Sequence, residues 1–100
     1  MKFSEMVEKV QGTVVVDNPE AEISSAYCGD ESVLITVQNH LNAIAVCSLA
    51  GIEAVLICHG RPVPDDMKAA AEREGVGIAV TALSQFAAAV ALSSLVPAAK

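Results

Sequence analysis

The stretch Val33-Leu-Ile-Thr-Val-Gln-Asn-His-Leu-Asn42 decides the fold of this chain. Its first five residues are apolar or β-branched, as in a strand that is buried on both faces of a parallel sheet. Three polar residues (38–40) then interrupt the run, and helical apolar spacing starts at Leu41. Similar strand-to-loop junctions follow at 54–61 and 78–84. Such short β-α-β connections predict a parallel sheet with helices over its faces, because the crossovers are right-handed.

The flanking residues extend this pattern to a single three-layer α/β/α domain over residues 1–100, with a mostly parallel sheet. Apolar residues three or four positions apart predict helices, and β-branched runs bounded by turn residues predict strands. The expected helices cover 3–11, 40–50, 65–74 and the residues between Ser84 and Pro97; the expected strands cover 13–16, 33–37, 54–58 and 78–80, with a strand or extended loop over 21–28.

Capping residues set the expected helix boundaries. Ser, Thr and Asn side chains satisfy free amides at a helix N-terminus, and Gly adopts the left-handed backbone that ends many helices. Thr81 or Ser84 is the expected cap of the last helix, whose buried side would carry Phe86, Val90 and Leu95. The other expected caps and stops are Ser4, Gly12, Asn39, Gly51 and Gly75.

Composition restricts the possible partners. The net charge is −6, and the six Lys and Arg residues are spread thinly, so a basic patch for nucleic acid is not expected. Only three aromatic residues are present, too few for stacking on single strands. Apolar residues make up 53% of the chain, above the roughly 45–50% of soluble domains. The excess favours a homodimer; a monomer with an Ala-rich exterior is the alternative.

Hydropathy and cysteine usage predict a cytoplasmic protein without a membrane segment. The longest apolar run, Phe86–Leu92, has 7 residues, whereas a spanning helix needs about 20. The N-terminus lacks the apolar core of a signal peptide. Three irregularly spaced Cys indicate reduced, mostly buried thiols. Cys47 is expected to be a buried small hydrophobe, and Cys28 to be more exposed, where a Cys–His nucleophile is conceivable.

Polar residues gather where the predicted strands end, and in a parallel sheet those ends share one edge. Helix N-termini attract anions there, Arg61 could hold a carboxylate or phosphate, and Gly60 would allow close backbone approach. The alternative is ordinary capping and loop chemistry, and neither nucleotide-binding glycine fingerprint is present. The candidate residues for a small anionic ligand or nucleotide are Asn39, His40, Asn42, His59, Gly60, Arg61 and Thr81.

Other constellations carry weaker hypotheses. His40 and His59 lack the ligand number and spacing of a zinc site, so no metal is expected. Ser24 and Tyr27 are candidates for the dimer interface, where Tyr is a good anchor. The acidic residues of 65–74 read as a solvated helix face, with Lys68 paired to Glu72 four residues on.

The order of elements and two junctions resemble the DRTGG domain, a family named for Asp-Arg after one strand and Thr-Gly-Gly after the next. In this chain the first position reads Thr36-Val-Gln-Asn-His40, and the second reads Ile57-Cys-His-Gly60, followed by Pro64-Asp-Asp66. The resemblance covers residues 20–95 and rests on pattern and spacing, since Gly60 alone retains a letter of the name.

The resemblance implies a fold like the N-terminal domain of HPr kinase/phosphorylase. It implies a non-catalytic regulatory or interaction module, often dimeric, because the family also occurs in regulatory pyrophosphatases beside nucleotide-binding CBS modules and in larger phosphotransacetylases. The stretch Gln38-Asn-His-Leu-Asn42 is similar to small proteins found with iron-only hydrogenase genes, which implies an accessory of a redox or hydrogenase system. We expect no catalytic residues and no cofactor. Docking to a partner enzyme, sensing of a small ligand and, with least support from the residues, an enzyme remain open alternatives.

Overall fold

A computed structural model describes residues 2–19, 21, 23, 25–26, 32–37 and 39–93. The helices and strands lie close to the expected ranges. In chain order they are α1 (Phe3–Lys9), β1 (Thr13–Val16), β2 (Ser25–Ala26), β3 (Ser32–Thr36), α2 (Leu41–Ala50), β4 (Ala54–Ile57), α3 (Asp65–Glu74), β5 (Gly77–Val80) and α4 (Gln85–Ser93).

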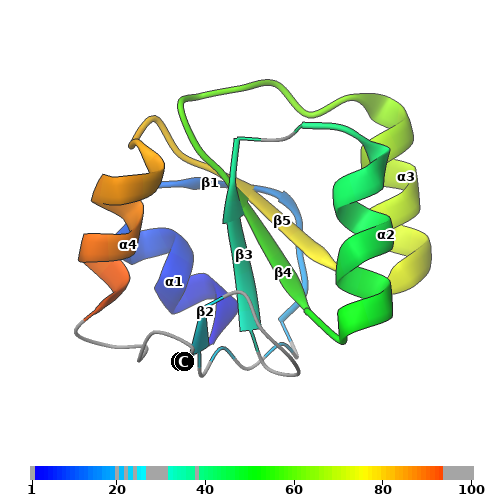
Figure 1. Cartoon of the computed structure of the whole chain (residues 1–100), viewed down its shortest axis with the longest axis horizontal. Helices are drawn as coiled ribbons and strands as arrows, with labels where there is room; N and C mark the ends of the chain where they lie inside the picture. The colour runs from blue at the N-terminus through cyan, green and yellow to red at the C-terminus, as the bar shows by residue number, and fades with distance from the viewer. Residues whose placement is uncertain are drawn as a thin grey trace.

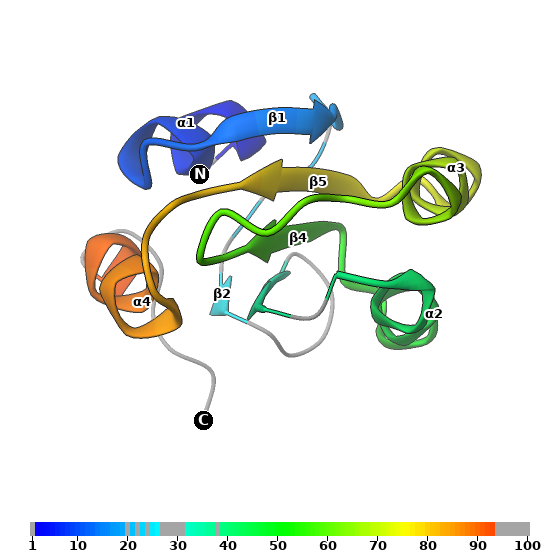
Figure 2. The ribbon, with the colours of Figure 1, turned by 90° about the horizontal axis from the view of Figure 1, so that it is seen from above.

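The strands form one sheet in the order β1-β5-β4-β3-β2, covered by helices on both faces (Figures 1 and 2). Strands β2 to β5 run parallel, and β1 pairs antiparallel with β5 at one edge. Helices α2 and α3 cover one face, and α1 and α4 cover the other. The expected three-layer fold with a mostly parallel sheet is therefore confirmed.

Strand β4 lies at the centre and is buried on both faces. Ala54 and Leu56 face the α1–α4 side, and Val55 and Ile57 face the α2–α3 side. These four side chains and that of Cys58, the residue after the strand, are fully buried. Burying one large apolar side chain stabilises the folded state by about 2 kcal/mol, so this strand contributes strongly to the stability of the sheet.

Two expected N-caps are wrong. At α1 the N-cap position belongs to Lys2, whose amide donates to Glu5 Oε1 at 3.2 Å, so Ser4 lies inside the helix. At α2 the N-cap position belongs to His40, which makes no side-chain capping bond. Asn39 precedes the N-cap position by one residue, and its side-chain amide donates a hydrogen bond to the Pro62 carbonyl in the loop after β4.

The glycine stops are correct at Gly51 and Gly75, which have left-handed backbones at φ 75° and 72°. After α1, however, the left-handed residue is Gln11, at φ 54°. Gly12 is required for a different reason, because a Cβ there would lie 2.9 Å from the Val80 carbonyl oxygen of β5. A close approach of two backbones thus replaces the expected helix stop.

The buried side of α4 differs from expectation. Phe86 is 79% exposed and Val90 is 56% exposed, whereas Ala88 and Leu92 enter the core. Leu95 lies outside the described residues. Because the helix is apolar almost all round, its periodicity could not select the buried side.

Thr81 holds the start of the chain against the sheet. Its buried hydroxyl donates to the Val10 carbonyl at 2.6 Å and accepts from the Leu83 amide at 3.2 Å. Ser84, the other expected cap of α4, accepts from the Ala87 amide at 3.0 Å and is the actual N-cap.

We expect Thr81→Val to lower the free energy of unfolding by about 1–3 kcal/mol, because the buried Val10 carbonyl would lose its donor. Thr81→Ser keeps the hydroxyl and loses one methyl group, so it should cost only about 1 kcal/mol. Urea unfolding followed by circular dichroism measures both values. A Thr81→Val protein as stable as the wild type would contradict this role.

Candidate functional site

Three loops meet where β3, β4 and β5 end, at the top of Figure 1. Backbone hydrogen bonds hold them together. The Cys58 amide donates to the Thr36 carbonyl at 2.8 Å, and the His59 amide donates to the Leu83 carbonyl at 2.9 Å. The Gly60 amide donates to the Thr81 carbonyl at 2.8 Å. These amides are used within the protein, so the exposed side chains of the loops carry any ligand chemistry at this edge.

His59 and Gly60 form a turn in which both residues have left-handed backbones, at φ 61° and 62°. This conformation is uncommon for a residue with a side chain, although His tolerates it better than most. The turn lifts the exposed imidazole of His59 out of the end of the buried strand β4. Strained backbone of this kind concentrates at functional positions, so His59 remains a site candidate.

A side-chain bond joins the first two loops. The Asn39 amide nitrogen donates to the Pro62 carbonyl at 2.9 Å, which ties the β3–α2 loop to the β4–α3 loop. His40 follows at the exposed N-cap position of α2. The structure therefore brings Asn39 and His40 to the loop that carries His59, Gly60 and Arg61, as the sequence predicted.

Arg61 borders a surface hollow of about 450 Å³, which we call the Arg61 hollow. A second cation, Lys68 of α3, lines it and is only weakly neutralised, because its ion pair with the fully exposed Asp65 spans 3.6 Å. That pair replaces the expected pairing of Lys68 with Glu72. The remaining lining residues are Thr13, Val15, Gly60, Pro62, Val63 and Val80.

Two predicted ligand residues do not join this cluster. Thr81 is only 2% exposed, and its hydroxyl already makes two hydrogen bonds within the protein. The hydroxyl could contact a ligand only if these bonds were broken. Asn42 lies on α2, in a different hollow between α2 and α3. Ser24, Tyr27 and Cys28 lie outside the described residues.

The two described cysteines are buried, as expected. Burial raises the pKa of the Cys47 thiol from 9.0 to about 11, and it raises the pKa of Cys58 as well. A thiol with a raised pKa carries little thiolate at neutral pH, so neither is suited to nucleophilic attack. Within the described part of the chain, no three His, Cys, Asp or Glu side chains gather as metal ligands would.

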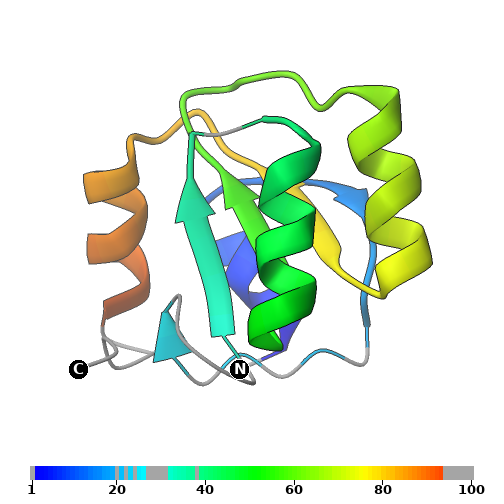
Figure 3. The same cartoon turned by 45° about the vertical axis from the view of Figure 1, so that its right-hand side comes forward.

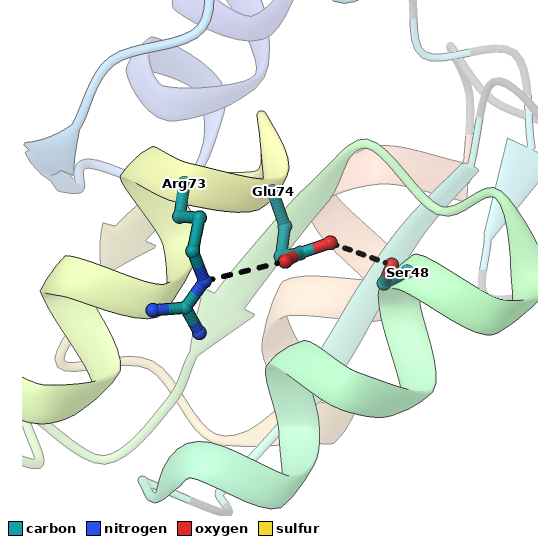
Figure 4. Close-up of polar contacts among 3 residues, drawn as sticks. All are labelled: Ser48, Arg73 and Glu74. Carbon is teal, nitrogen blue, oxygen red and sulfur yellow. Dashed lines mark hydrogen bonds and ion pairs between the residues drawn. The ribbon is translucent and has the colours of Figure 1, made fainter.

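Sequence reasoning missed a second surface feature, the α2–α3 hollow, which measures about 430 Å³. Ser48 of α2 donates to Glu74 Oε1 at 3.0 Å, and Arg73 Nε lies 3.4 Å from Glu74 Oε2 (Figure 4). Beside this polar bridge Leu49 is 91% exposed. The signal was available in the sequence, since α2 contains no charged residue at all.

A solved structure shares this architecture. It is the regulatory region of Clostridium perfringens pyrophosphatase, with its CBS and DRTGG domains, complexed with the activator diadenosine tetraphosphate. The TM-score is 0.72 over 91% of this chain, which spans 45% of that one, and the sequence identity is 9%. The likeness shows a common fold, so the expected α/β fold of the DRTGG kind is confirmed.

No family model matches the sequence. No curated protein matches it either. Among the described residues, no helix has the length and hydropathy needed to cross a membrane.

Exchanging His59 should reveal the cost of its left-handed backbone. We expect His59→Gly to leave the free energy of unfolding unchanged or to raise it by up to about 1 kcal/mol, since Gly adopts this conformation freely. His59→Val should lower it by about 1–2 kcal/mol, because a β-branched residue is strongly disfavoured there. Equal stability of the two variants in urea unfolding would show that the turn is not strained.

Proposed function

We propose that this chain is a non-catalytic regulatory module that acts by binding, as a homodimer that docks a partner enzyme. The observation that carries the proposal is a pair of uncharged helices, α2 and α4, on opposite faces of the sheet. Each presents apolar side chains to solvent in the single chain, with Leu49 of α2 and Phe86 of α4 the most exposed.

A helix that is apolar all round is normally covered on every side. Here the sheet covers only the inner side of α2, where Ala43, Ile44 and Cys47 are buried. Exposed apolar patches of this kind mark interaction surfaces in soluble proteins. Two patches on opposite faces allow a second copy and a different protein to bind at the same time.

The relation to known proteins supports a regulatory role. The similar C. perfringens structure is the regulatory region of its enzyme, and it binds an activator. The resemblance of Gln38–Asn42 to small proteins encoded with iron-only hydrogenases supports an enzyme of a redox or hydrogenase system as the partner.

A second candidate function is the sensing of a small anion or nucleotide at the Arg61 hollow. Two cations, Arg61 and Lys68, border this hollow in a chain of net charge −6, so its local charge is opposite to that of the whole protein. Arg recognises phosphate or carboxylate through paired hydrogen bonds. His59 and Asn39, on the adjoining turn and loop, would complete the contacts.

Photocrosslinking tests partner docking through α4. We expect a photoreactive phenylalanine analogue at Phe86, introduced in the native cell, to yield a defined adduct with another protein, identified by mass spectrometry. The same analogue at Glu72, exposed on α3, serves as the matched control and should give no such adduct. Adducts of equal pattern from both positions, or from neither, would overturn the docking role of α4.

Thermal unfolding with a panel of nucleotides and phosphorylated metabolites tests the sensor. A ligand at 100 times its Kd stabilises the protein by about 2.7 kcal/mol. We expect Arg61→Ala to abolish such stabilisation while changing the ligand-free stability by less than about 0.5 kcal/mol, as for a surface residue. Arg73→Ala, an exposed arginine outside the Arg61 hollow, should retain it. Equal loss in both variants would exclude this site.

A further inference from the structure

Helix α2 presents a line of small and apolar residues to solvent. Leu41, Ala45 and Leu49 are four residues apart, so they lie one above the other on a helix. Leu41 is 43% exposed, Leu49 is 91% exposed, and Ala45 between them is exposed too. In Figure 3, α2 lies in front of the sheet with α3 beside it.

The sequence of α2 is nearly symmetric about Ala45. Residues 41–49 read Leu-Asn-Ala-Ile-Ala-Val-Cys-Ser-Leu. Pairs at equal distances from Ala45 match in chemical type: Val46 with Ile44, Cys47 with Ala43, Ser48 with Asn42, and Leu49 with Leu41. In two antiparallel helices related by a two-fold axis at residue 45, the exposed pairs Leu41–Leu49 and Asn42–Ser48 face one another across the contact. Ala43, Ile44 and Cys47 are buried in the core of their own copy.

From this symmetry we infer that α2 is the homodimer contact, packed antiparallel against α2 of a second copy around a two-fold axis at Ala45. The inference rests on the proposed binding function. Of the two apolar surfaces, on α2 and α4, it assigns the one on α2 to the second copy. A two-fold contact uses the same patch on both copies, and the exposed Leu41 and Leu49 lie at equal distances from Ala45 within such a patch. Leu41 of each copy meets Leu49 of the other, and the small Ala45 lets the backbones approach.

Shape supports the same arrangement. The α2–α3 hollow, about 430 Å³, begins at Leu41 and Ala45 and continues to Ala70 of α3. The exposed Leu49 also lines it, so each copy offers an apolar side chain beside a recess that both apolar and polar residues line. Two copies of α2 and α3 would then form a four-helix layer between the two sheets.

Charge supports it as well. Each copy carries a net charge of −6, so two copies repel each other over most of their surfaces. Helix α2 has no charged residue, and the charged pair at the rim of the hollow, Arg73 and Glu74, is neutral overall (Figure 4). At this contact the two acidic proteins therefore meet without repulsion between negatively charged side chains.

Helix α4 lacks these properties. About its middle residue Ala89, the exposed Phe86 is matched by Leu92, which is 3% exposed and belongs to the core. In an antiparallel pair of α4 helices, Phe86 of one copy would lie opposite Leu92 of the other, whose side chain is buried and offers no contact. In α2 the exposed Val46 is likewise matched by the buried Ile44, but the most exposed residue, Leu49, is matched by the exposed Leu41. That pair of exposed leucines assigns α2 to self-association and leaves α4 for a different protein.

The contact is small. A 10-residue helix is about 15 Å long, in a body of 33 × 25 × 22 Å. Interfaces at the lower end of the size range bind weakly, so the dimer should dissociate on dilution, with a Kd on the order of micromolar. Sedimentation over a range of concentrations measures this dependence.

Disulfide trapping tests the axis. Helix axes about 8–10 Å apart bring facing Cα atoms to about 4–6 Å, within the range of a disulfide. In a Cys28→Ser background, Ala45→Cys should give a covalent dimer on mild oxidation, resolved on a non-reducing gel. Ala89→Cys, an equally exposed alanine in α4, is the control and should stay monomeric.

The outcomes separate the inference from the proposed function. Trapping through residue 89 and not 45 would overturn the α2 axis while keeping a homodimer. Trapping through neither, with a wild-type protein that sediments as a monomer at every concentration, would overturn both the axis and the dimer. Ala45→Arg should raise the dimer Kd at least tenfold at unchanged thermal stability, whereas Ala69→Arg, exposed on α3, should not.

Discussion

The rest of the structure depends on the complete burial of β4. Five consecutive side chains, Ala54 to Cys58, are shielded from water on both faces of the sheet. Such a strand needs a helical layer on each side and a hydrogen-bonded strand at each edge. β3 and β5 supply the edges in parallel register, and the two helix pairs supply the faces.

Burial of β4 also shapes the edge where ligands would bind. The chain must leave the core abruptly after Cys58, and it does so through the left-handed turn at His59 and Gly60. The carbonyls of Leu83 and Thr81, in the segment after β5, accept the amides of this turn. The side chains of His59 and Arg61 are exposed to solvent. Hydrogen bonds thus hold the backbone of this edge, while its side chains are open to solvent.

On each face of the sheet, one of the two covering helices carries no charge: α2 on one face and α4 on the other. The core uses only the inner side of α2 and α4, so their outer sides keep apolar residues that folding does not need. The acidic charge of the chain lies elsewhere, as at Asp65, Asp66 and Glu72 of α3. The proposed association surfaces therefore lie on the uncharged helices, apart from the charged surface of α3.

Much of the fold and part of the candidate site could be predicted from the sequence. The short apolar runs at 33–37, 54–58 and 78–80 predicted the strands, because buried parallel strands read as continuous apolar runs that are rich in β-branched residues and bounded by turn residues. The junction residues Asn39 and Arg61 were placed at one edge by the same logic. The hydrogen bond of Thr81 could not be predicted, because its partner, the Val10 carbonyl, is 71 residues away and no local pattern reveals it.

The sequence by itself determined which segments form strands and helices, since those choices follow from local periodicity and from glycine stops such as Gly51 and Gly75. Only the tertiary structure decided which sides of α2 and α4 are buried. A helix that is apolar all round has no preferred inner side of its own. The position of the sheet selects Ala88 and Leu92 for the core and turns Phe86 outward, and the same selection leaves Leu49 on the surface.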